Sequence, residues 1–178
     1  MTYDVVTFGT EALRKKGIPV AEVTDEIKQL VKDMLETMYA TNGVGLAAEQ
    51  VGRTERLCVI DVPKDSEKPD CADFNAKIEM PLVLINPEIT AKSGSQRNGE
   101  GCLSFPDIFV QITRANEVTV SYTGLDGKRH EATARGLLAR AIQHEYDHLD
   151  GILLVDRMSA VQRMSVSGKL RRMKAANQ

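Results

Sequence analysis

The chain has 178 residues, 42% of them hydrophobic and 27% charged, and its formal net charge is −2. This length is enough to bury a core and suits one domain, so we expect a single domain over residues 1–178. The composition excludes a disordered chain, and the small net charge excludes a protein that coats nucleic acid. We therefore expect a soluble globular protein without direct DNA binding.

Cysteine usage points to a reducing compartment. The chain has 3 cysteines, at positions 58, 71 and 102, and this odd number does not form a disulfide framework. The first residues lack the basic flank and apolar run of a secretory signal, and no stretch approaches the roughly 18 apolar residues of a membrane span. We expect a cytoplasmic protein with no membrane association.

The first predicted helix lies within residues 24–43. Thr24 or Asp25 can cap its start, and Asn42 with Gly43 can end it. Its apolar residues fall at helical spacing on one face: Ile27, Leu30, Val31, Met34, Leu35, Met38 and Tyr39. After it, RLCVIDV (56–62) and MPLVLINPEI (80–89) are typical of strands, whereas the polar, proline-containing residues 64–77 predict a loop.

The second half of the chain predicts a hairpin and two helices. Residues 116–134 alternate apolar and polar side chains around Asp126-Gly127, a strong turn signal. A helix follows over 135–148, and a last, basic helix over 159–175 carries Arg163, Lys169, Arg171, Arg172 and Lys174. This order, without regular βαβ alternation, predicts an α+β fold of mainly antiparallel sheets around the 135–148 helix, with a C-terminal helix.

QHEYDHLDG (143–151) is the most informative stretch. His144 and His148 lie four residues apart, on one face of the predicted helix, so both imidazoles can reach one ion such as Zn²⁺ or Fe²⁺, with Glu145 beside them as a proton carrier. The alternative is two solvated histidines. The apolar face of this helix, including Leu137 and Ile142, runs toward them, and inward-pointing polar groups without partners are costly. A metal site removes that conflict.

A catalytic metal site needs three protein ligands and an open position. No histidine or glutamate follows His148, so a third ligand must lie upstream. The sequence offers His130, Cys58, Cys71, Cys102 and several carboxylates. Cys102 is the preferred candidate because Gly99 and Gly101 precede it and permit the close backbone approach that a site loop requires.

Three separated segments, GVGLAAEQVG (43–52), EGCLS (100–104) and QHEYDHLDG, resemble the three signature motifs of peptide deformylases. Alone, the first would be a glycine-flanked turn and the second a loop with a thiol. LINPEI, VTFGTEALRKKG and VDRM also resemble that family. The resemblance implies hydrolysis of the N-formyl group from the initiator methionine of new polypeptides, with N-formylmethionyl peptides as substrates.

The resemblance also implies roles for individual residues. Cys102, His144 and His148 would bind one divalent metal, Fe²⁺ in the cell, with Zn²⁺, Ni²⁺ or Co²⁺ able to substitute. Glu145 would move the proton of the attacking water to the leaving amine. The resemblance also assigns the amide of Gln50 and the backbone N–H of Leu103 to the oxyanion, and the open backbone of Gly45 to close substrate approach. By their positions in the sequence, Val44, Leu137 and Ala141 are candidate walls of the methionine pocket, and Glu100 is a further candidate beside the substrate.

Several alternatives stay open. Glu100 could orient a neighbouring side chain or be a solvated loop charge, and the proposed pocket walls could be plain core. Some family members carry an arginine three residues after the proline of the cysteine motif, where this chain has Phe109, so contacts beyond the methionine are not predicted. The basic last helix resembles one that docks on the ribosome in bacterial relatives, which suggests weak ribosome contact. The main rival function is an HExxH metallopeptidase; a structural zinc protein is a third.

Overall fold

Residues 1–178 are all described by the computed structural model. The helices are α1 (Asp25–Ala40), α2 (Pro69–Phe74), α3 (Gly136–Leu149), α4 (Leu154–Arg157) and α5 (Ala160–Ala176). The strands are β1 (Gly45–Ala47), β2 (Leu57–Ile60), β3 (Leu82–Ser93), β4 (Gln96–Cys102), β5 (Phe105–Arg114), β6 (Glu117–Thr123) and β7 (Arg129–Arg135). Short 3₁₀ turns cover Glu11–Arg14, Ala48–Val51 and Lys64–Ser66.

Two antiparallel sheets make up the β part of the fold. One has five strands in the order β1-β2-β3-β6-β7, and the other is the β4-β5 ribbon. Every pairing of neighbouring strands is antiparallel. The predicted α+β class with mainly antiparallel sheets is confirmed. β1 pairs only with β2 and β4 only with β5, so each keeps one free edge.

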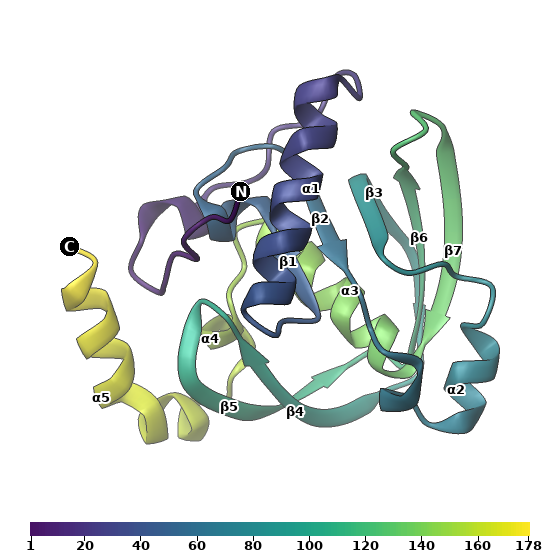
Figure 1. Cartoon of the computed structure of the whole chain (residues 1–178). Helices are drawn as coiled ribbons and strands as arrows, with labels where there is room; N and C mark the ends of the chain where they lie inside the picture. Colours follow the sequence, from purple (N-terminus) through teal and green to yellow (C-terminus); the bar gives the residue numbers. More distant parts are fainter.

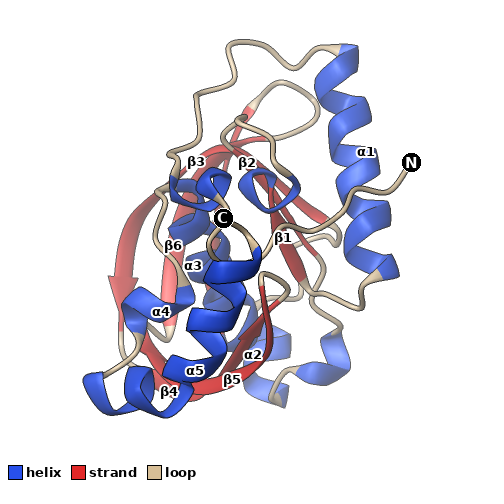
Figure 2. Ribbon diagram, turned by 90° about the vertical axis from the view of Figure 1, so that its left-hand side faces the viewer, coloured by secondary structure: helices blue, strands red, loops and turns tan.

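The five-stranded sheet lies between two helices (Figure 1). Apolar side chains of α1 pack with Leu46, Leu57 and Ile85 in one core cluster, and those of α3 pack with residues of β2, β3 and β6 in another. A third cluster joins β5 to α4 and α5, which lie beside the ribbon (Figure 2). Helix α3, which carries HEYDH, thus packs against the sheet on one side and reaches the ribbon on the other.

The predicted loop over residues 64–77 is wrong in part, because α2 forms within it. Pro69 occupies the first turn of α2, where its missing N–H costs nothing. The segment also completes α3, whose N-cap Arg135 offers no side-chain cap. The carboxylate of Glu67 accepts the N–H groups of Leu137 at 2.5 Å and Leu138 at 3.2 Å, which supplies the anion that a helix start favours.

The other predicted elements form close to their expected limits. Thr24 caps α1 through a hydrogen bond from the Ile27 N–H, and Ser159 caps α5 through one from Gln162. The sequence predicts Cys102 in a loop, but it is the last residue of strand β4, immediately before the tight turn into β5. None of the helices is both long and apolar enough to cross a membrane.

Candidate metal and active site

The candidate metal site forms where α3 faces the end of β4. His144 and His148 stand one turn apart on α3, with their ring centroids 5.0 Å apart. Ligand atoms of these two histidines and the Cys102 thiol all lie within 4.8 Å of one another. The three residues predicted to bind a metal are therefore brought together by the fold, from segments more than 40 residues apart in the chain.

The two imidazoles are held differently. Nδ1 of His144 lies 2.9 Å from a carboxylate oxygen of Glu100, so its Nε2 is left to face the other donors. Nε2 of His148 lies 3.4 Å from Cys102 Sγ, and its Nδ1 has no partner. Burial lowers the pKa of His148 well below its usual value, so its ring is neutral, as a metal ligand must be.

Glu100 is the centre of a buried charge network. It is 6% exposed and accepts hydrogen bonds from Arg114 at 2.6 and 2.9 Å and from Arg140. Burial alone would raise the pKa of this carboxyl, but the bonds from His144 and Arg114 hold it near 2. Both carboxylate oxygens of Glu100 therefore have hydrogen-bond partners, and the contact with Nδ1 fixes the orientation of the His144 ring. A carboxylate–histidine pair of this kind is typical of metal sites.

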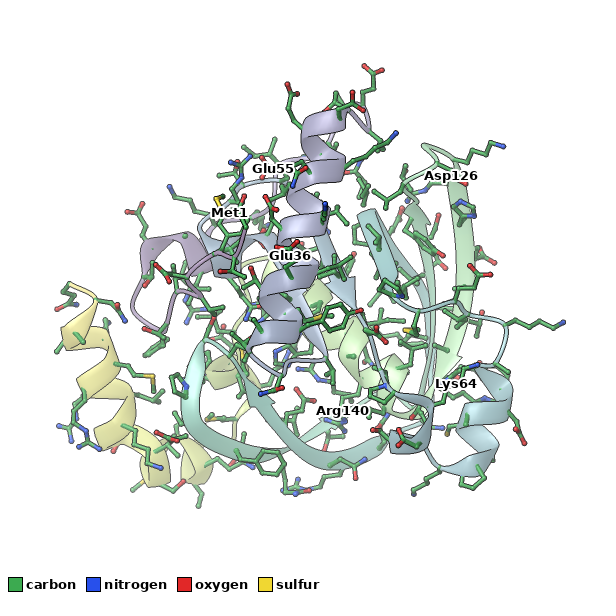
Figure 3. All side chains as sticks on the ribbon, in the orientation of Figure 1. Met1, Glu36, Glu55, Lys64, Asp126 and Arg140 are labelled. Carbon is green, nitrogen blue, oxygen red and sulfur yellow. The ribbon has the colours of Figure 1, made fainter.

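The same network includes residues that sequence reasoning missed. Arg114 also donates to Asp147 at 2.9 Å, and Arg157 donates to that carboxylate at 2.8 and 3.0 Å. Arg140 points inward between α3 and the β4-β5 ribbon (Figure 3). One signal could have found it, because Arg140 precedes His144 by four residues and so shares its helix face.

Gln50 reaches the site from the 3₁₀ turn after β1. Its side-chain oxygen accepts the Ala47 N–H at 2.9 Å, which fixes the orientation of the amide. The amide nitrogen then lies 3.6 Å from Cys102 Sγ and 3.2 Å from the hydroxyl of Ser104. This turns a buried N–H donor toward the metal-ligand cluster, where a developing negative charge can use it.

Glu145 lies beside the histidines and has no hydrogen-bond partner on one carboxylate oxygen. Burial raises its pKa to about 7, which suits a group that takes up and releases a proton. Gly45 makes room for it, since a Cβ at that position would lie 2.5 Å from the other carboxylate oxygen. The glycine predicted for close substrate approach thus also has a packing role next to Glu145.

A cavity of about 640 Å³ opens onto these groups. Its lining includes the predicted residues Val44, Gly45, Gln50, Glu100, Cys102, Leu103, Leu137, Ala141, His144 and Glu145. Only His148 among the predicted site residues is not in the lining, and it is 1% exposed. A cavity of this size accommodates more than one side chain.

The rejected ligand candidates lie elsewhere. His130 pairs with Asp126, and Figure 3 shows Asp126 at the tip of the β6-β7 hairpin, far from Arg140. Cys58 is fully buried in the core between the sheet and α3. Cys71 is also buried, on α2, where it packs against Gly136.

The donor set fits one divalent metal ion. A thiol and two imidazoles suit Zn²⁺ or Fe²⁺, and three protein ligands leave a position for water or substrate. The unpartnered carboxylate oxygen of Glu145 and the fixed orientation of His144 are further features expected around such an ion. Together with the apolar cavity, they describe a single-metal hydrolase of α+β fold.

Comparisons with known proteins identify the family. The polypeptide deformylase family model matches residues 2–164. Peptide deformylases of Nitrosococcus oceani and Acidobacterium capsulatum are both 43% identical to this chain, over 93% and 100% of it and 92% and 99% of their own lengths. The chain therefore belongs to the polypeptide deformylase family, enzymes that remove the N-formyl group from new polypeptides, and it is a metal-dependent hydrolase.

Solved structures agree with this assignment. The peptide deformylase of Legionella pneumophila is 37% identical and superposes with a TM-score of 0.84, covering 99% of this chain and 97% of that one. A peptide deformylase of Synechococcus elongatus in complex with actinonin, also 37% identical, superposes with a TM-score of 0.83 over 95% of this chain and 86% of that one. The fold is thus that of the family along nearly the whole chain.

Proposed function

We propose that Cys102, His144 and His148 hold one divalent metal ion, Fe²⁺ in the cell, and that the cavity beside them takes the formylmethionine of a new polypeptide in the cytoplasm. The observation that carries this proposal is the convergence of the three donor atoms within 4.8 Å, next to Glu145 and at the wall of one cavity. Zn²⁺, Ni²⁺ and Co²⁺ have compatible ligand preferences and could replace Fe²⁺.

When bound, the metal supplies Lewis-acid chemistry that makes water a strong nucleophile near neutral pH and polarises the formyl oxygen. Glu145 accepts the proton of the attacking water and delivers it to the amine that leaves. Support for this role comes from its buried position beside both histidines and its free oxygen. Glu100 keeps Nδ1 of His144 occupied, and Arg114 and Arg140 hold Glu100 in place.

The negative charge that develops on the formyl oxygen needs hydrogen-bond donors. We assign these to the side-chain amide of Gln50 and to the backbone N–H of Leu103, which lies in the turn between β4 and β5. The support for Gln50 is its amide orientation, with the nitrogen directed toward the thiol. Removing such a donor typically costs about 10²- to 10³-fold in rate.

The substrate would lie extended between the free edges of β1 and β4, which both line the cavity. An extended peptide can then form backbone hydrogen bonds with either edge, as in strand addition. The methionine side chain would point toward Leu137 and Ala141 on α3, with Val44 at the mouth. Ala141 is 6% exposed, whereas Val44 is 40% exposed, which suits an inner and an outer wall.

Glu145→Gln tests the mechanism. Because the amide cannot accept the proton, we expect deformylation of a formyl-Met-Ala-Ser peptide to fall by about 10²- to 10⁴-fold while bound metal is unchanged. Cys102→Ala should instead lower the metal content of the purified protein. Near wild-type turnover by the Glu145→Gln protein with metal in place would refute the mechanism. Cleavage of unformylated Met-Ala-Ser would favour the metallopeptidase alternative.

We also propose weak, salt-sensitive docking of α5 on ribosomal RNA. Residues 160–176 contain no aspartate or glutamate, and Arg171, Arg172 and Lys174 are exposed without an ion pair. Arg171→Glu with Arg172→Glu should remove ribosome co-sedimentation at low salt, because phosphate contacts dominate such binding. Lys28→Glu with Lys32→Glu on α1 changes the net charge equally and should leave it intact. Equal losses in both pairs would contradict a site on α5.

A further inference from the structure

Phe109 on β5 is 73% exposed, the only strongly exposed aromatic side chain in the lining of the cavity. A single exposed phenylalanine does not by itself indicate a binding site. Phe109, however, packs next to two glycines of the neighbouring strand β4. A Cβ at Gly99 would lie 2.1 Å from the ring, and one at Gly101 would lie 3.5 Å from it. The absence of side chains at these two positions of β4 thus leaves room for the Phe109 ring against the ribbon.

The two faces of the ribbon differ sharply. Glu100 of β4 is buried toward α3, where it meets His144, and its partner Val110 on β5 is buried in the core cluster under α5. Gly101 pairs with Phe109 in the next register position, so both belong to the opposite face. Phe109 therefore extends the cavity on the face turned away from the metal ligands.

The alternation of side chains along an extended strand then indicates which substrate residue contacts the Phe109 ring. In an extended peptide beside β4, successive side chains point to opposite faces. If the methionine side chain enters toward Leu137 and Ala141 on the α3 side, the side chain of the second residue points to the face that carries Phe109. The cavity of about 640 Å³ continues from one position to the other, since its lining includes Ala141 and Phe109 alike.

We propose that Phe109 is a specificity-determining residue that favours an apolar second residue, such as leucine, in the formylated peptide; this inference rests on the proposed function. The aromatic face offers a broad apolar contact, and the carboxylate of Asp107 on the same cavity wall disfavours an acidic side chain there. A substrate side chain that covers one face of the Phe109 ring removes part of its own apolar surface from water.

The test compares formyl-Met-Leu-Ala with formyl-Met-Gly-Ala. We expect the wild-type protein to prefer leucine by about tenfold in kcat/KM, since partial burial of a leucine side chain is worth about that factor. Phe109→Ala should reduce the preference to about twofold, and Phe109→Leu, which keeps an apolar side chain, should retain most of it. A matched control is Phe74→Ala on α2, a phenylalanine with 39% exposure outside the cavity, which should change nothing.

Three results would overturn the inference. The leucine preference could be absent in the wild-type protein, or it could survive in Phe109→Ala. Alternatively, Phe109→Ala could alter the ratio between formyl-Met-Ala-Leu and formyl-Met-Ala-Gly, which would assign the ring to the third residue. Each of these results is compatible with intact deformylation. A wild-type protein that hydrolyses none of the four peptides would instead contradict the proposed function itself.

Discussion

Glu100, which contacts His144, and Glu49, which precedes Gln50, are two buried glutamates, at 6% and 0% exposure. Glu100 is held by two arginines and His144, whereas neither carboxylate oxygen of Glu49 has a hydrogen-bond partner. Burial alone would raise the pKa of both carboxyl groups. Partners bring that of Glu100 down to about 2, while that of Glu49 stays at about 8 despite the charge of Arg56. Partners, rather than depth, decide the charge of these two groups.

The difference has a consequence for the site. An ionised Glu100 orients His144 and is neutralised by its arginines, so it adds little net charge near Cys102. Glu49, next to Gln50, is protonated at neutral pH and adds none. The charge of Glu145 contributes to the raised pKa of Glu49, and because a protonated Glu49 is neutral, the two buried carboxyl groups do not repel each other.

Arg114→Met gives the largest expected effect, because it removes partners from Glu100 and Asp147 at once. Breaking a buried ion pair by deleting one partner typically costs about 3 to 5 kcal/mol, since a charge is left without compensation. Urea unfolding at pH 7 with saturating Zn²⁺ should show this loss in the free energy of unfolding, with an unchanged dependence on urea concentration.

The matched control is Arg53→Ala. Arg53 forms an equally short pair with Glu55, at 2.6 Å, but their side chains are 46% and 21% exposed. A solvated pair of this kind contributes at most about 1 kcal/mol. If Arg114→Met were as mild as Arg53→Ala, the buried network would not stabilise the fold, and the comparison between Glu100 and Glu49 would lose its basis.

Much of this arrangement could be predicted from local signals. α1 and α3 follow from apolar spacing and end residues, and the β6-β7 hairpin follows from Asp126-Gly127. Helix α2 could not be predicted in the same way, because it has only 6 residues in a polar segment and depends on packing against the start of α3.

In the candidate site, too, some residues could be predicted from local signals and others could not. His144, Glu145 and His148 have a recognisable spacing, and Cys102 follows two closely placed glycines. Of the two arginines that hold Glu100, Arg140 has one signal, its place four residues before His144, whereas Arg114 lies 14 residues beyond Glu100 and looks like an ordinary surface arginine in the sequence. Sequence patterns report local periodicity, whereas charge compensation is decided by contacts that exist only after folding.

Glu49→Gln tests the uncompensated side, with a smaller effect that depends on pH. The folded pKa of Glu49, about 8, exceeds the unfolded value of 4.5, so the folded protein holds the proton more tightly. The resulting stability is complete below pH 4.5 and is lost as the pH rises toward 8. At about 1.4 kcal/mol per unit, wild type should lose about 2 to 3 kcal/mol more than Glu49→Gln between pH 5 and pH 7. Urea unfolding at several pH values measures this difference, and parallel curves for the two proteins would mean that Glu49 is already ionised at pH 5.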